Sequence, residues 1–354
     1  MKNFFKFVFA SCLGIFLFII AFGLIGSVWL GRLASAGAKP RPVKPNSVLK
    51  ITLDKPIPER TNNIPFDFSN LKEEKVLGLS DILRTIEAAK DDDRIEGIYL
   101  EIDVAPIGLS TATELRRALE DFSESGKFII AWSRFYDQRA YYLASVADEV
   151  LLHPLGLVDL RGFGAVVPYF KNMLDKVGIE MEVFYAGNYK SATEPFRLTK
   201  MSEYNRQQLH EYLDPLAAEF LGQIAEARGL PFDSLEAIVN GFVGRNATMC
   251  LRSGLVDQLT WKDSVRVLIR EELGLDEDDE VPVVTLTQYF EHVKPEVDYS
   301  VKDRIAVVYA EGAIVDGKGE QGQIGDEKYT KILRELRQSD RVKAVVLRVN
   351  SPGG

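Results

Sequence analysis

Lys190 is the residue whose surroundings most suggest chemistry. It lies in "YAGNYKSATEPF", residues 185–196, between a turn of small residues and a proline. A lysine amine acts as a general base only when it is neutral, so it must be desolvated or placed near another cation. The neighbouring side chains offer apolar walls and hydroxyls: Tyr189, Ser191, Ala192, Thr193, Pro195 and Phe196. Glu194 could instead form an ion pair that keeps the amine charged, so both a catalytic base and a solvated surface charge stay open.

A second candidate is the stretch "LRVNSPGG", residues 347–354, which ends in Gly353 and Gly354. Two adjacent glycines after a buried strand let the backbone present its N–H groups to a ligand oxygen, as an oxyanion hole requires. An ordinary turn is the simpler interpretation of these residues taken alone. Their place at the carboxyl end of a predicted strand, where open parallel sheets bind ligands, favours a binding role.

The elements that must position these residues alternate between strands and helices. The apolar patterns predict strands at 47–54, 95–103, 128–132 and 180–186, and helices at 80–93, 110–127, 169–178, 263–274 and after Ser202. Thr111 and Glu114 have the spacing of a capping box. Such alternation calls for parallel strands joined by right-handed crossovers, with helices covering the sheet. The predicted fold class is therefore α/β.

The sequence repeats itself. "DRIEGIYLEID" at 93–103 aligns without a gap with "DRVKAVVLRVN" at 340–350, and residues 47–57 align with 304–314 in the same order. Both pairs are about 250 residues apart, which indicates an internal duplication. We expect a first domain over 47–300 and the start of a second, truncated domain over 301–354. The parent chain would then have about 550 to 600 residues.

The N-terminus predicts a membrane anchor. Residues 7–30 carry no charge, and a helix of that length spans a hydrocarbon core of about 30 Å. The small residues at 34–36 also resemble a signal-peptide cleavage site, but the apolar run is longer than a typical signal peptide's. We therefore expect an uncleaved anchor over 1–37 with its transmembrane helix at about 7–30. A proline-rich spacer follows over 38–46.

Composition excludes several function classes. The formal net charge of −9 argues against a general nucleic-acid binder. Cys12 and Cys250 give neither a disulfide framework nor a CxxC metal spacing. His153, His210 and His292 are scattered, without the spacing of a metal site. We therefore expect no bound metal.

Several motifs together resemble one family. "GNYKSATEPF" at 187–196 is followed by "KMS" at 200–202, "YYLASVADEVLLHPLGLVDLRGFG" stands at 141–164 and "LRVNSPGG" ends the chain. These stretches resemble the signal peptide peptidase A family, also called protease IV, in its long, duplicated form. The resemblance runs from the anchor to residue 354. It implies a ClpP/crotonase-like fold of repeated ββα units and peptide hydrolysis by a Ser/Lys dyad, without metal or cofactor.

The resemblance also implies roles for single residues. Lys190 matches the family's general base, and Gly353 and Gly354 match the glycines beside the substrate that help form the oxyanion hole. The nucleophilic serine of the family would lie beyond residue 354, in the second repeat. At the equivalent place of the first repeat, Arg139 or a neighbour replaces it, and we interpret the nearby serines, Ser133 and Ser145, as structural.

The implied function is that of a membrane-anchored serine endopeptidase that degrades cleaved signal peptides and other short hydrophobic peptides. The family's properties imply a tetramer on the outer, periplasmic face of the bacterial cytoplasmic membrane, held by a single pass. Residues 1–354 without the nucleophile are expected to be inactive. Two alternatives stay open: an acyl-CoA enzyme of the same fold, and a membrane-anchored scaffold without catalysis.

Overall fold

The computed structural model describes residues 42–61, 76–293, 300–320 and 322–354, and residues 13, 14, 16, 18, 20 and 22. Met1–Val43 and Lys44–Gly354 are two compact units. The predicted transmembrane helix over 7–30 lies outside the described residues apart from those scattered positions, as does most of the anchor and spacer over 1–46. Among the helices that are described, none has both the length and the apolar character needed to cross a bilayer.

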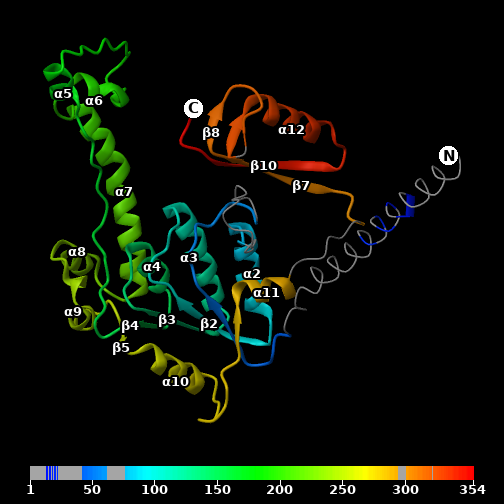
Figure 1. Cartoon of the computed structure of the whole chain (residues 1–354). Helices are drawn as coiled ribbons and strands as arrows, with labels where there is room; N and C mark the ends of the chain where they lie inside the picture. The colour runs from blue at the N-terminus through cyan, green and yellow to red at the C-terminus, as the bar shows by residue number, and fades with distance from the viewer. Residues whose placement is uncertain are drawn as a thin grey trace, which may run out of the picture. The chain divides into compact units, whose positions relative to one another are not determined.

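A six-stranded parallel sheet forms the centre of the larger unit (Figure 1), with strand order β5-β4-β3-β2-β1-β6. The strands are β1 Ser47–Ile51, β2 Ile95–Glu101, β3 Phe128–Ser133, β4 Glu149–Leu152, β5 Gln258–Leu259 and β6 Val283–Thr285. All neighbouring strands pair in parallel. The predicted α/β class with parallel strands is therefore confirmed.

Helices cover both faces of this sheet, which explains why its strands are apolar almost throughout. The helices are α2 Leu79–Asp91, α3 Leu109–Ser123, α4 Gln138–Ala144, α8 Phe232–Asn240, α9 Ala247–Arg252, α10 Lys262–Glu272 and α11 Leu286–Val293. On one face, the sheet side chains of Tyr99, Ile130 and Trp132 pack against Val265 and Ile269 of α10. On the other face lie α2, α3 and α4 (Figure 1).

One predicted helix start differs from the structure, and another is confirmed. Helix α3 begins at Leu109 and is preceded by Gly108, which makes no side-chain capping bond, so the capping box predicted for Thr111 and Glu114 is wrong. Glu114 instead reaches an arginine far along the chain, as described below. By contrast, the start predicted after Ser202 is confirmed, because the Ser202 side chain accepts a hydrogen bond from the backbone N–H of Asn205.

Residues 161–219, here called the arm, leave the core. Between Leu160 and Phe220 the buried side chains are those of Glu194 and Asn205. The stem of the arm is α7 Glu203–Ala227, and its far end carries α5 Lys171–Lys176, α6 Glu194–Arg197 and a 3-10 turn at Ser191–Thr193 (Figure 1). The strand predicted at 180–186 is wrong: these residues pair with no other strand in the described chain and are mostly exposed.

The region after residue 300 repeats the strand, helix, parallel strand arrangement of β1, α2 and β2. Strands β7 Arg304–Glu311 and β10 Val342–Asn350 pair in parallel, with α12 Asp326–Gln338 between them in sequence. Tyr329 of α12 donates a hydrogen bond to the Tyr309 carbonyl of β7, 2.8 Å. Two short strands, β8 Ala313–Val315 and β9 Gln323–Gly325, form a small sheet beside them. A domain boundary near residue 301 stays a prediction.

Candidate active site

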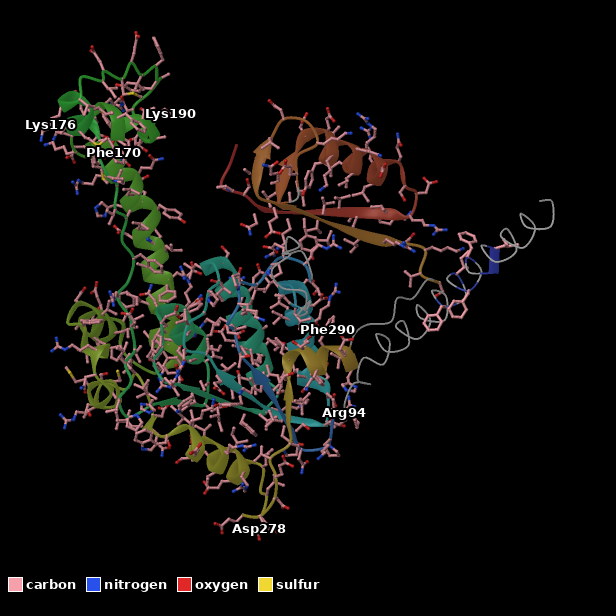
Figure 2. All side chains as sticks on the ribbon, in the orientation of Figure 1. Arg94, Phe170, Lys176, Lys190, Asp278 and Phe290 are labelled. Carbon is pink, nitrogen blue, oxygen red and sulfur yellow. The ribbon has the colours of Figure 1, made fainter. Side chains whose placement is uncertain are left out.

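Lys190 lies near the far end of the arm (Figure 2), immediately before the 3-10 turn Ser191–Thr193. Its side chain is exposed. Within the described chain it has neither an ion-pair partner nor a side-chain hydrogen bond. Aromatic rings line this end of the arm: Tyr189 packs edge-on against Tyr204 at 5.5 Å, and Phe170 stacks on Phe196 at 6.0 Å. The apolar walls expected around the lysine are therefore nearby but leave it open to solvent.

Glu194 forms no ion pair with Lys190 among the described residues, although the sequence left that pair open. Its carboxylate is 1% exposed and accepts hydrogen bonds from the Ser202 hydroxyl, the Ser202 N–H at 3.3 Å and the Asn205 amide at 2.9 Å. Arg197 lies 3.9 Å from it. Because these groups occupy the carboxylate, Glu194 fixes the turn around Lys190 and does not neutralise the amine. This role of Glu194 was not apparent from the local sequence, since its partners lie eight and eleven positions further on.

The Glu194 network predicts a pH response of the arm. Burial works to raise the pKa of this carboxyl, but the hydrogen bonds from Ser202 and Asn205 hold the pKa below its usual 4.5. A carboxylate with a depressed folded-state pKa stabilises the fold above the unfolded pKa, and this stabilisation is lost as the pH falls through the folded value. We therefore expect the protection of backbone amides at 190–205 against hydrogen exchange, relative to their intrinsic exchange rates at each pH, to fall below about pH 4.5.

The matched variant for this experiment is Glu194→Gln, which keeps the shape but cannot ionise. It should exchange faster at neutral pH and lose the acid dependence in this segment, measured by hydrogen exchange of the 1–354 chain. Identical acid dependence in Glu194→Gln and the wild type would contradict the assignment.

Gly353 and Gly354 follow β10 in a loop that only glycine fits. Gly353 has a φ of +111°, which strains other residues. A Cβ on Gly354 would lie 2.6 Å from the Ile314 carbonyl oxygen. The loop is held by two bonds: Gly353 N–H donates to the Ser351 hydroxyl at 3.1 Å, and Ile314 N–H donates to the Gly353 carbonyl at 2.9 Å. The backbone of the two glycines therefore lies close to Ser351 and Ile314.

The structure does not bring the predicted site residues together. No hydrogen bond in the described chain joins Lys190 to Gly353 or Gly354, which lie on separate elements. The described residues also hold no group of three His, Cys, Asp or Glu side chains arranged to bind a metal ion.

The first repeat carries a different cluster where the second has its glycine loop. Asp103, which aligns with Asn350, accepts hydrogen bonds from the Ser133 hydroxyl at 2.7 Å and from the Arg134 backbone N–H at 2.9 Å. Burial works to raise the pKa of Asp103, and the bonds from Ser133 and Arg134 lower it. Ser133 is fully buried, and Arg139 is exposed. The hydroxyl of Ser133 is therefore held in a structural network.

Comparison with known proteins identifies related chains. Residues 121–276, which include Lys190, match Peptidase family S49. Protease 4 of Salmonella typhi is 34% identical over 290 residues, which cover 78% of this chain and 46% of that protein. Protease 4 of Haemophilus influenzae is 31% identical over 283 residues, covering 77% and 46%. Serine protease SPPA, chloroplastic, of Arabidopsis thaliana is 29% identical over 283 residues, covering 78% and 42%.

These matches confirm the family resemblance that the sequence motifs indicated. The chain spans less than half the length of each of these three relatives.

Proposed function

Because residues 121–276 form a peptidase family S49 domain, we propose that the full-length protein is a serine peptidase with Lys190 as its general base. The observation that carries this proposal is the engagement of Glu194 by Ser202 and Asn205, which leaves the Lys190 amine without a carboxylate partner. When a substrate or a neighbouring domain desolvates an unpaired amine, the neutral form is favoured, and that form can accept a proton from a serine hydroxyl. The fold proposed for the full-length protein is the ClpP/crotonase-like arrangement of repeated ββα units.

In the proposed reaction, neutral Lys190 takes the proton of a serine hydroxyl located beyond residue 354. The serine oxygen then attacks the carbonyl carbon of a peptide bond, and the backbone N–H groups of Gly353 and Gly354 stabilise the resulting oxyanion. For this, the hydrogen bond that Gly353 N–H donates to the Ser351 hydroxyl in this structure must first break. Collapse of the intermediate expels the amine of the leaving peptide, which takes the proton from Lys190. The neutral Lys190 then takes a proton from water, whose oxygen attacks the acyl-enzyme carbonyl, and returns it to the serine oxygen as the carboxylic acid product leaves.

The proposed substrates are cleaved signal peptides and other short hydrophobic peptides. They would bind in extended form against a strand edge. The proposed location is the periplasmic face of the bacterial cytoplasmic membrane, with the N-terminal segment as a single-pass anchor.

We further propose assembly into a homo-oligomer, with the tetramer implied by the family. The arm supports this, because it exposes large apolar side chains such as Val166, Val177 and Phe184 that a partner could cover.

The missing nucleophile gives a direct test of this proposal. Residues 1–354 alone are expected neither to hydrolyse peptides nor to react with a fluorophosphonate probe, because the family resemblance implies that Arg139 or a neighbour stands where the first repeat would need its serine. Ser133 and Ser145 are buried and hydrogen-bonded, so neither should react. Gel fluorescence of the labelled chain measures this.

The full-length protein is the positive control and should be labelled at one serine and lose its peptidase activity. Labelling of the 1–354 chain that abolishes hydrolysis would contradict the expectation. A full-length protein that is neither labelled nor active would instead favour the membrane-anchored scaffold.

A further inference from the structure

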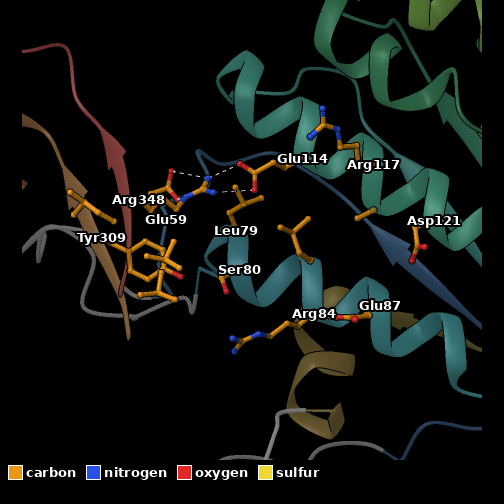
Figure 3. A pocket seen from close by; sticks show the side chains of 15 residues that line it. Glu59, Leu79, Ser80, Arg84, Glu87, Glu114, Arg117, Asp121, Tyr309 and Arg348 are labelled. Carbon is orange, nitrogen blue, oxygen red and sulfur yellow. Dashed lines mark hydrogen bonds and ion pairs between the residues drawn. The ribbon is translucent and has the colours of Figure 1, made fainter. Parts of the chain in front are cut away.

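Arg348 makes the ion pairs that join β10 to the first repeat (Figure 3). Its guanidinium Nε and Nη2 donate to the two carboxylate oxygens of Glu59, the second at 3.4 Å. Its Nη1 and Nη2 donate to the two oxygens of Glu114, at 3.2 and 2.7 Å. Glu59 follows β1 and Glu114 lies on α3. One guanidinium therefore holds two carboxylates, each through both of its oxygens.

This contact is partly shielded from water. Glu59 is only 8% exposed, so its carboxylate needs a cation or hydrogen-bond donors in place of solvent. The hydrogen bonds that Arg348 donates to Glu114 and Glu59 raise its pKa further above the usual value. Bidentate hydrogen bonds between a guanidinium and a carboxylate fix the relative orientation of the two groups as well as stabilising their contact. The position of Arg348, and hence of β10, is thereby set relative to α3.

Apolar packing contributes little around this contact. A cavity of about 690 Å³ lies between helices α2 and α3 on one side and strands β7 and β10 on the other. The strand residues Val307 and Val346 that line it are about half exposed. In the described part of the chain, the ion pairs of Arg348 and a cation–π contact of Arg60 with Tyr309 of β7, at 5.8 Å, connect these two layers.

The first repeat has an ion cluster of opposite sign at the same strand position. Glu101 aligns with Arg348 in the ungapped match of the two repeats, and it pairs with Lys50 at 2.6 Å and with Lys262. Both lysines belong to the first repeat, so all the ion pairs of that cluster lie within one repeat. Arg348 reaches across instead, to two residues of the other repeat.

We propose that Arg348 is a positioning residue: by clamping β10 to Glu59 and Glu114, it places the loop with Gly353 and Gly354 relative to the repeat that carries Lys190. Arg348 lies three residues before Ser351, at the end of the strand that leads into this loop. A base and an oxyanion hole supplied by different repeats must be held in a fixed position relative to each other. Small misplacements of reacting groups can cost about 10²-fold in rate. This role rests on the proposed peptidase function.

The test uses the full-length protein with Arg348→Gln, Glu114→Gln and the double variant. We expect each to lower kcat for a hydrophobic peptide about tenfold or more, with KM changed less than about twofold, because the displaced groups act in the transition state. The double variant should be no worse than Arg348→Gln, since either change already breaks the pair. The matched control is Lys343→Gln on the same strand, whose partner Asp303, at 3.6 Å, lies in the same repeat.

Hydrogen exchange separates this proposal from the peptidase function itself. Amides at 348–354 should exchange about tenfold faster in Arg348→Gln than in Lys343→Gln, whether or not the wild type hydrolyses peptides. A wild type without peptidase activity would overturn the proposed function alone. The exchange result would still show whether Arg348 holds β10 and its loop in place. Wild-type kcat in Arg348→Gln, or exchange equal to that of Lys343→Gln, would overturn the clamp.

Discussion

Replacing Lys190 by alanine in the full-length protein is expected to lower kcat/KM for peptide hydrolysis by at least about 10³-fold. The amine is the only group proposed to accept the proton of the nucleophilic serine, and a protonated hydroxyl is a weak nucleophile. Folding should be unaffected, because the Lys190 side chain is exposed and the turn around it is held by Glu194. Steady-state kinetics of the purified protein with a fluorogenic hydrophobic peptide measure the loss.

Two further variants show whether the loss reflects proton transfer. Lys190→Arg keeps a positive charge, but a guanidinium does not deprotonate in proteins, so it should be as inactive as the alanine variant. Lys176→Ala changes another exposed lysine of the arm (Figure 2) and should retain wild-type activity. Activity retained in Lys190→Ala, or restored in Lys190→Arg, would remove the lysine from the role of base.

Sequence patterns predict three of the six strands of the central sheet, β1, β2 and β3, because their apolar runs are buried on both faces, whereas the short strands β4, β5 and β6 were not predicted. The predicted strand at 95–103 is β2 Ile95–Glu101, and that at 128–132 is β3 Phe128–Ser133. Apolar runs of this kind depend on burial by helices, and the intervening helices are themselves visible in the sequence as apolar stripes. The long helix after Ser202 was predictable for a local reason, since a capping serine acts on the turn that follows it.

The predictions that failed depend on contacts distant in sequence. Residues 180–186 have the apolar alternation of a strand, but a strand forms only where a neighbour offers hydrogen bonds, and the described chain places none beside them. Glu114 has the spacing of a capping residue, yet its carboxylate pairs with Arg348, 234 positions away. Nothing in the local sequence distinguishes these two uses of a glutamate.

In the candidate site, too, features set by local sequence were predictable and contacts between distant residues were not. The motif around Lys190 identified the residue, and the glycine pair after β10 was recognisable from its position at a strand end. The tie between Glu194 and Asn205 and the clamp of Arg348 were not predictable, because both arise from side chains that only the folded chain brings together.

The base of the arm depends on a buried cation, Arg116, which is 2% exposed. Its Nη1 donates to the Tyr142 carbonyl and to the Ser145 hydroxyl at 2.8 Å, and its Nη2 donates to the Gln223 carbonyl of α7 at 3.0 Å. Its Nε lies 2.8 Å from a carboxylate oxygen of Glu120. Burial lowers the pKa of Arg116, so these partners must compensate the desolvated charge. A single side chain thus links α3, α4 and the stem of the arm.

Arg116→Met is therefore expected to destabilise this junction by about 3 kcal/mol, because it leaves buried acceptors unsatisfied while keeping most of the volume. The free energy of local opening, measured by hydrogen exchange of amides in α4 and in α7 near Gln223, should fall by that amount. Arg117→Met is the matched control, since Arg117 is the next residue of α3 and is exposed. Equal exchange in the two variants would contradict this role. A selective loss at α4 and α7 would mean that Arg116 anchors the stem of the arm that carries Lys190.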